Sequence, residues 1–157
     1  MNLSGIHKNR YLYHEHLLSY CTRVNVSELI NMLIFAQNNI DALNLKVVGN
    51  VIFRIIEIVQ DIGSDIYSIE VLIPIDKAFK SKGQCIYKPE FKINNALSYM
   101  FYDINEIGEI KTQLCEYAEK NNIKPITDFY FVLLQCEKGN MTSTVFEAYL
   151  GISENTV

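Results

Sequence analysis

The same order of strands and helices occurs twice along this chain, and this repetition constrains the fold more than any other feature. Helices are expected to start near residues 27 and 105, and the strands after them near 51 and 129 and near 66 and 144. Each pair of starts is 78 residues apart, although few residues are identical between the halves. A regular offset across several elements indicates that one supersecondary unit has been duplicated.

Two stretches have the apolar periodicity of an amphipathic helix. The first is Ser27–Leu43, for which Asn25 or Ser27 is a candidate N-cap. The second is Glu106–Asn121, for which Asn105 is the candidate cap.

The remaining apolar segments are rich in β-branched and aromatic residues, which favour strands. Turn residues at Asp61–Asp65 in the first half and Gly139-Asn140 in the second separate pairs of these segments, as in β-hairpins. The segment Lys77–Lys92 carries Lys, Ser, Gly and Pro and is expected to be a surface connection. The expected strands are Tyr11–Arg23, Val51–Val59, Ile66–Ile75, Asn95–Asp103, Asp128–Cys136 and Thr144–Ile152.

Together these elements predict an α+β fold built from a duplicated β-α-β-β unit. We expect an antiparallel sheet with two helices packed on one face, which leaves room for a cleft on the other face. The 157 residues are expected to form a single domain with two pseudo-repeats, about 10–76 and 93–153. No Pro/Gly/Ser-rich linker divides the chain into separate domains.

Alternation along the strands predicts which side chains lie on the sheet face away from the helices. That face combines tyrosines with charged side chains, which is typical of a small-molecule site and equally of a protein interface. Cation–π attraction and charge pairing would suit it to a lipophilic or cationic ligand. The candidate ligand-binding residues are Arg54, Glu70, Met100, Tyr102, Asp128, Tyr130, Glu147 and Tyr149.

Plainer interpretations of the charged candidates remain open. Arg54 and Glu70 also fit a cross-strand ion pair at a partly wet surface. Asp128 and Glu147 also fit solvated residues of a half-exposed antiparallel sheet.

The net charge of −4 and the scattered lysines and arginines predict that the chain does not bind nucleic acid, which needs a concentrated basic stripe. No apolar run reaches the length of about 20 residues that spans a bilayer, and the polar start, Met1–Arg10, has no targeting segment. The cysteines Cys21, Cys85, Cys115 and Cys136 are widely spaced and are expected to be reduced, buried thiols. We therefore expect a cytoplasmic protein.

Few residues suggest catalysis or a cofactor. His14 and His16 would point the same way on a strand and could share a metal ion, but a third ligand is not evident, so no metal or cofactor is expected. No nucleophile or phosphate-loop motif occurs, so an enzyme is not expected. The alternative is a hydrolase that uses Glu147 with Tyr130 or Tyr149.

Two short motifs resemble those of the gyrase-inhibitor-like superfamily, which includes the effector-binding domains of multidrug-responsive and AraC-type transcription regulators. Ile69–Ile75 looks like its Glu-Val-x-x-Pro-Ile strand, and Ile123–Tyr130 looks like its approach to an acidic strand. The resemblance, which covers Tyr11–Ile152, implies a bacterial protein whose cleft glutamate meets cationic ligands. Asp128 falls on that position, and Glu147 also fits the acid-x-Tyr pattern.

Three functions follow as hypotheses. The first is a stand-alone module that binds a small lipophilic or cationic ligand. The second is a protein-interaction or accessory protein, for example of a bacterial secretion or toxin system, whose aromatic face binds a partner or a second copy. The third is the hydrolase.

Overall fold

The computed structural model describes residues 5–137 and 140–153, with side chains at all of these except residue 61 and residues 135–143. Within these residues the fold is α+β, with six strands and two α-helices in the predicted order of strand, helix, strand, strand, repeated once. The elements are β1 (Ile6–Asn25), α1 (Leu29–Asn38), β2 (Ile52–Asp61), β3 (Ser64–Pro74), β4 (Ile86–Phe101), α2 (Ile107–Lys120), β5 (Pro125–Glu137) and β6 (Asn140–Ile152).

The chain divides into two compact units. The N-terminal unit is formed by residues 14–91, and the C-terminal unit by residues 92–153 together with residues 5–13. β1 and β4 therefore each contribute residues to both units. That the chain is one domain with repeats at about 10–76 and 93–153 stays a prediction.

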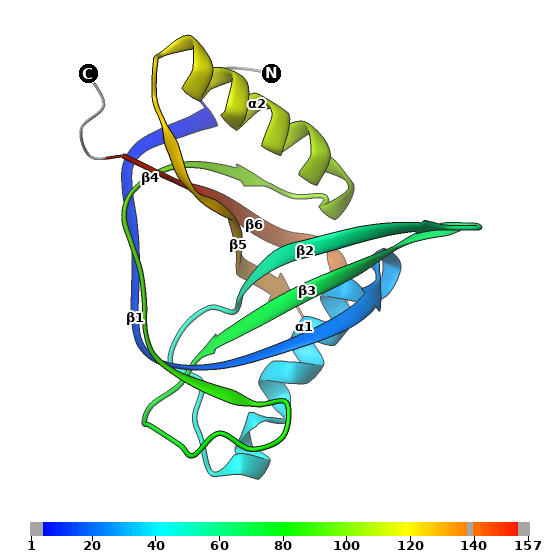
Figure 1. The fold of residues 1–157 in the computed structure, drawn as a ribbon. Helices are drawn as coiled ribbons and strands as arrows, with labels where there is room; N and C mark the ends of the chain where they lie inside the picture. The colour runs from blue at the N-terminus through cyan, green and yellow to red at the C-terminus, as the bar shows by residue number, and fades with distance from the viewer. Residues whose placement is uncertain (1–4, 138–139, 154–157) are drawn as a thin grey trace. The chain divides into compact units, whose positions relative to one another are not determined.

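In the N-terminal unit, β3 pairs antiparallel with β1 on one side and with β2 on the other, so the three strands lie side by side (Figure 1). The predicted hairpin between β2 and β3 is confirmed, because Asp61 pairs with Ser64. Gly63 occupies its turn at φ 100°, a conformation that glycine adopts without strain. Leu29 and Leu33 of α1 are buried, as the periodicity predicts.

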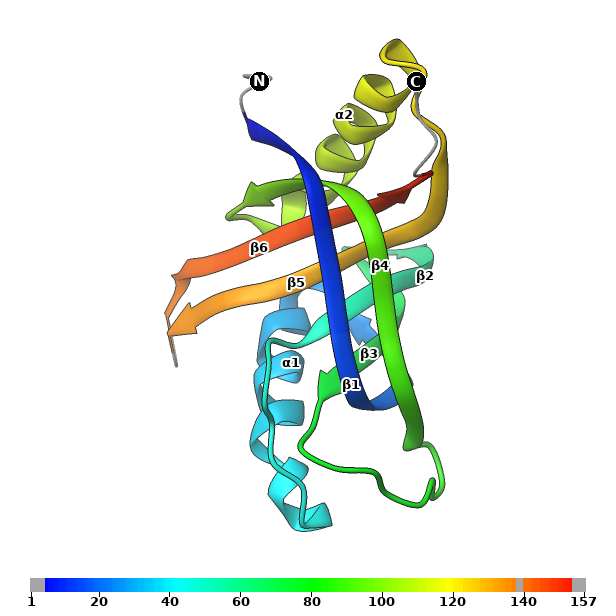
Figure 2. The same cartoon turned by 90° about the vertical axis from the view of Figure 1, so that its left-hand side faces the viewer.

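In the C-terminal unit, β6 pairs antiparallel with β4 and with β5, which runs beside it in Figure 2. The core contains three phenylalanines. The Phe101 ring stacks on that of Phe146 with centroids 5.2 Å apart and meets the Phe131 ring edge-on at 6.1 Å. Nζ of Lys111 in α2 lies 5.6 Å from the Phe129 ring centroid, which places α2 on the side of β5 that carries Phe129 and, by alternation, Phe131.

The helix ends differ from expectation in detail. The predicted helix at 27–43 is a shorter α-helix flanked by 3₁₀ turns at Val26–Glu28 and Ile40–Leu43. Asn25 is the cap, since its side chain accepts a hydrogen bond of 3.0 Å from the Ser27 amide. At α2 the predicted cap Asn105 is wrong. Asp103 instead caps the 3₁₀ turn Ile104–Glu106 that precedes α2, where its side chain accepts a hydrogen bond of 2.9 Å from the Asn105 amide.

Two further expectations are corrected. The Lys77–Lys92 segment is not wholly a surface connection, because β4 begins at Ile86. Cys21 and Cys115 are exposed rather than buried, although they and Cys85 are free thiols as predicted. The expected turn at Gly139 and the side chain of Cys136 lie outside the described residues. Neither described α-helix has the length and apolar character needed to cross a membrane.

Candidate functional site

Each unit buries one glutamate at the matching place in its strands. Glu70 on β3 is 6% exposed and Glu147 on β6 is 3% exposed. Glu70 pairs in register with Cys21 of β1, and Glu147 pairs with Met100 of β4. This shared register favours the predicted duplication, which itself stays a prediction.

A buried serine holds each glutamate. Ser19 Oγ donates a hydrogen bond of 2.7 Å to Glu70 Oε2, and Ser98 Oγ donates one of 2.8 Å to Glu147 Oε2. Each serine lies on the neighbouring strand, two residues before the register partner of its glutamate. A buried carboxylate requires such donors because it has lost its hydration.

Two basic side chains form ion pairs with Glu70. Arg54 Nε lies 2.7 Å from its Oε1, and Lys88 Nζ lies 2.7 Å from its Oε2. Although burial raises the pKa of Glu70, the hydrogen bonds from Lys88, Arg54 and Ser19 lower that pKa to about 2. Glu70 therefore stays ionised at neutral pH, with two basic side chains in contact with its carboxylate.

Glu147 has a different set of partners. Arg10 Nη2 lies 3.2 Å from Oε1 and 3.3 Å from Oε2, and the Tyr149 hydroxyl donates to Oε1 at 2.7 Å. Arg10 also donates a hydrogen bond of 3.0 Å to the Tyr149 hydroxyl. Its guanidinium carbon lies 5.8 Å from the centroid of the Tyr149 ring. Burial and the hydrogen bond to Glu147 raise the pKa of Tyr149 to about 12, so the phenol stays protonated.

The two clusters differ in charge balance. Among the described residues, Arg10 is the single cationic partner of Glu147, and its side chain is 45% exposed. Glu147 therefore has one cationic partner, whereas Glu70 has two. A solvent-reachable cation on a buried carboxylate is the kind of partner that a ligand cation can replace.

The register places four predicted site residues on one face of the C-terminal unit. Tyr130 pairs with Tyr149, and Met100 pairs with Glu147. Phe129 lies on the α2 side of β5, so alternation puts Tyr130 on the opposite side. Tyr130, Glu147 and Tyr149 therefore lie on the side of the sheet opposite Phe129, and that they form a ligand site stays a prediction.

The other predicted residues lie apart from this face or in the other unit. Tyr102 is exposed just beyond the end of β4. Asp128 is exposed next to a register shift between Pro125 and Phe129, where simple alternation does not hold. Arg54 and Glu70 form the cross-strand ion pair that the sequence allowed, but the carboxylate is buried rather than partly wet.

Four functional side chains were missed by sequence reasoning. Arg10 and Lys88 lie in polar segments that were expected to precede or connect strands. Ser19 and Ser98 lie within expected strands, but they carry no sequence signal for contacting a glutamate. The two serines are 79 residues apart and the two glutamates 77, so the 78-residue offset of the elements does not align either pair in the sequence.

The His14–His16 pair does not have the geometry expected of neighbouring strand positions. His16 has φ 60°, which breaks the alternation, and its Nδ1 hydrogen-bonds the Tyr87 hydroxyl at 2.6 Å. In the part of the chain that is described, no three His, Cys, Asp or Glu side chains come together in a metal-binding arrangement.

Comparison with known proteins shows the fold. No protein-family profile and no curated protein matches the sequence. The chain is similar in structure to EcmrR in its complex with DNA in EcmrR-RPo, with a TM-score of 0.70, 12% identity, and 96% of this chain aligned to 59% of that one. This chain therefore spans about three-fifths of EcmrR.

Two further structures share the fold. The crystal structure of the EcmrR C-terminal domain has a TM-score of 0.67 and 12% identity, over 92% of this chain and 96% of that domain. A hydrolase from Listeria innocua has a TM-score of 0.52 and 8% identity, over 92% of this chain and 91% of the hydrolase. Identities this low support a common fold and carry no function across.

Proposed function

We propose that this chain is a small-molecule-binding module of the gyrase-inhibitor-like, effector-binding type, and that Glu147 in its C-terminal unit binds a lipophilic cation. The observation that carries this proposal is the contact of Arg10 with both Glu147 and Tyr149. The guanidinium occupies the place that the positive group of a ligand would take.

The physical basis is the cost of an unpaired buried charge. Glu147 needs a positive partner because its own unit withdraws it from water. A ligand cation would restore that partner, and the Tyr149 ring would add cation–π attraction, as it does for Arg10. Half-buried Tyr130, the register partner of Tyr149, would supply an aromatic wall.

Glu70 is a poorer choice for the same role. Arg54 and Lys88 already satisfy its charge at 2.7 Å each, so an incoming cation would have to displace one of two close ion-pair partners. Of the predicted acids, Glu147 rather than Glu70 or Asp128 is therefore the proposed cation partner.

The fold is compatible with the class of function proposed. The chain shares its fold with the C-terminal domain of EcmrR, a protein that also forms a complex with DNA. This agrees with the sequence resemblance to effector-binding domains of transcription regulators. That this chain does not itself bind nucleic acid remains a prediction, to be tested by gel shift with duplex DNA.

A matched pair of ligands tests the proposal. Methyltriphenylphosphonium and neutral triphenylphosphine oxide have similar shapes and differ in charge. We expect the cation to raise the unfolding temperature of the wild-type protein by several degrees, and the oxide to do much less. Equal shifts with both ligands would show that the positive charge of the ligand does not contribute to binding.

The matched variants are Glu147→Gln and Glu57→Gln. Glutamine keeps the shape of Glu147 but removes its charge, so the advantage of the cation over the oxide should disappear. Glu57 is exposed on β2, and its replacement should leave that advantage intact. A cation effect that survives in Glu147→Gln contradicts the proposal.

The two alternatives remain predictions. A partner-binding role would show as self-association in sedimentation or as a specific host protein in a pull-down. A hydrolase role would show as ester or amide cleavage that Glu147→Gln abolishes. The raised pKa of Tyr149 argues against this tyrosine as a general base at neutral pH.

A further inference from the structure

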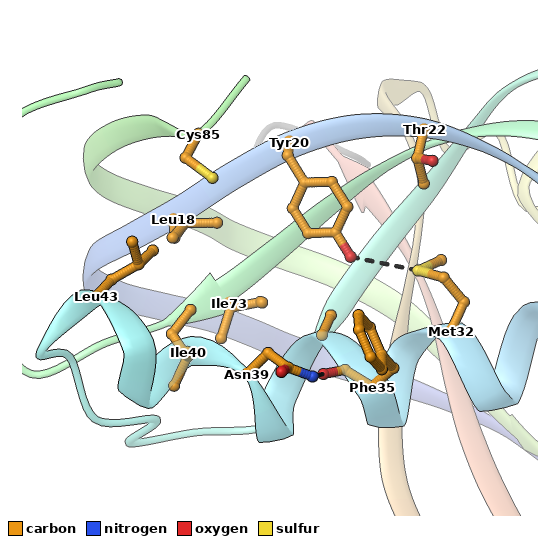
Figure 3. A pocket seen from close by; sticks show the side chains of 11 residues that line it. Leu18, Tyr20, Thr22, Met32, Phe35, Asn39, Ile40, Leu43, Ile73 and Cys85 are labelled. Carbon is orange, nitrogen blue, oxygen red and sulfur yellow. Dashed lines mark hydrogen bonds between the residues drawn. The ribbon is translucent and has the colours of Figure 1, made fainter. Parts of the chain in front are cut away.

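The N-terminal unit contains an apolar cavity that the proposed cation site does not use. The cavity has a volume of about 340 Å³ and lies between β1 on one side and α1 with the following 3₁₀ turn on the other (Figure 3). Small-molecule sites usually have volumes of about 300–1,000 Å³, so this one fits a compact ligand.

The cavity wall is almost entirely hydrocarbon. Leu18 of β1, Ile73 of β3 and Ile40 contribute aliphatic side chains from three directions, and Met32 of α1 adds an adaptable thioether. None of the described side chains that line the cavity is charged. A charged ligand would lose its hydration there without gaining a partner, so the cavity favours neutral molecules.

One lining group is poised to hold a polar atom. The Tyr20 ring points from β1 toward α1, and its hydroxyl hydrogen-bonds Met32 Sδ at 3.3 Å (Figure 3). A thioether is a weak acceptor, so a ligand oxygen would be a better partner for this hydroxyl. Burial, with a smaller contribution from Cys85, raises the pKa of Tyr20 to about 12 and keeps it a donor.

Asn39 is the amide side chain among the residues that line the cavity, and its nitrogen already makes one hydrogen bond within the helix. Asn39 Nδ2 donates a hydrogen bond of 2.7 Å to the Phe35 carbonyl near the C-terminal end of α1. The Phe35 and Leu43 side chains are exposed where they line the cavity, so a ligand has a route in from solvent. The geometry thus combines a mainly apolar chamber, an entrance and the Tyr20 hydroxyl as a donor whose present acceptor is weak.

From these features we propose that the cavity binds a neutral, mainly hydrocarbon molecule that carries one hydrogen-bond acceptor, which the Tyr20 hydroxyl holds. The site lies in the other unit from Glu147 and uses none of its residues. It would therefore operate independently of the proposed cation site.

The occupancy of the cavity is tested with N-phenyl-1-naphthylamine, a neutral probe that fluoresces in apolar surroundings. We expect the wild-type chain to enhance its fluorescence. Ala36→Phe fills the cavity from α1 and should abolish the enhancement, whereas Ala42→Phe adds the same ring at an exposed position outside the cavity and should not. The unfolding temperature shows whether both variants remain folded.

The Tyr20 contact is tested by displacing the probe with 2-acetylnaphthalene and with 2-ethylnaphthalene, which differ in a carbonyl oxygen. In Tyr20→Phe, the affinity for 2-acetylnaphthalene should fall about five- to ten-fold relative to that for 2-ethylnaphthalene. This is the usual effect of losing one hydrogen bond. An unchanged ratio would overturn the role assigned to Tyr20.

A second measurement does not depend on filling the cavity. In a variant that keeps Cys85 and replaces the other three cysteines with serine, bound probe should slow thiol labelling of Cys85. Probe binding that persists in folded Ala36→Phe, or labelling that the probe leaves unchanged, contradicts the proposal. The proposal is also contradicted if the wild-type protein is a dimer and Ala36→Phe is a monomer. In that case a second copy of the chain, rather than a small molecule, would occupy the cavity.

Discussion

The guanidinium of Arg10 lies 3.2 Å from Oε1 of Glu147, although 136 residues lie between them in the sequence. The Arg10 side chain is nearly half exposed. The carboxylate is buried and also accepts hydrogen bonds from Ser98 and Tyr149. The proposed cation site rests on this relationship, because it takes Arg10 to be a counter-ion that a ligand can replace.

Replacing Arg10 with alanine should increase the affinity for a lipophilic cation. The ligand no longer has to displace the guanidinium, and Glu147 gains from any new positive partner, so we expect methyltriphenylphosphonium to bind about ten-fold more tightly, or about 1.4 kcal/mol. Isothermal titration calorimetry at pH 7.5 measures the change. Lys8→Ala on the same strand is the control, because Lys8 lies over the Tyr117 ring instead. Weaker binding in Arg10→Ala would make Arg10 part of the ligand site rather than its substitute.

Replacing Glu70 with glutamine should destabilise the fold without affecting cation binding. The change leaves Arg54 and Lys88 close together without their shared anion, at a cost of about 2–3 kcal/mol. Urea unfolding at pH 7 measures this cost. Glu57→Gln should change stability by less than about 0.5 kcal/mol, as is usual for exposed positions. Loss of cation binding in folded Glu70→Gln would instead place the ligand at Glu70.

The same ion pairs predict how stability depends on pH. The pKa of Glu70 falls from 4.5 to about 2 on folding, so its contribution is complete above about pH 4.5 and is lost as the pH falls toward 2. We expect about 2 kcal/mol of stability to disappear over that window, allowing for solvent screening by the part-exposed Arg54 and Lys88. Urea titrations between pH 2 and 6 should show a smaller loss in Glu70→Gln, and equal losses in both proteins would be inconsistent with this pKa.

The two serines should be energetically equivalent. Ser19→Ala and Ser98→Ala each remove one donor from a buried carboxylate, so each should cost about 1–2 kcal/mol of unfolding free energy. Ser68→Ala is the matched control, since its hydroxyl meets Arg23 at an exposed surface. A large cost at one buried serine and none at the other would argue against equivalent roles in the two halves.

Local patterns were enough to predict the element order and much of one face. Alternation around Glu147 and Tyr149 is regular, so their shared side of β6 follows from the sequence. The helix at 107–120 follows from its apolar stripe because the spacing of 3.6 residues is a local property.

The partners of the glutamates could not be predicted in the same way. Asn9 and His16 have positive φ within β1, so alternation cannot be followed along it to Arg10. Lys88 reaches Glu70 from a segment that contains Pro89, a residue that disfavours central strands. Which cation meets which acid depends on strand register between distant segments, and single-sequence periodicity carries no information about register.

The apolar cavity was missed for a related reason. The sequence pointed to the sheet face away from the helices, whereas Tyr20 and Ile73 line a cavity on the side of α1. Periodicity assigns such residues to a helix-covered core, and it cannot show that side chains of these sizes leave about 340 Å³ unfilled.

A crystal structure of the protein with methyltriphenylphosphonium is the most direct test of the cation site. We predict that the phosphonium group lies within about 6 Å of the Glu147 carboxylate, a typical distance for a stabilising opposite charge. The Arg10 side chain should have left both Glu147 and Tyr149. A complex in which Arg10 keeps its contacts and the cation is bound elsewhere would contradict the account.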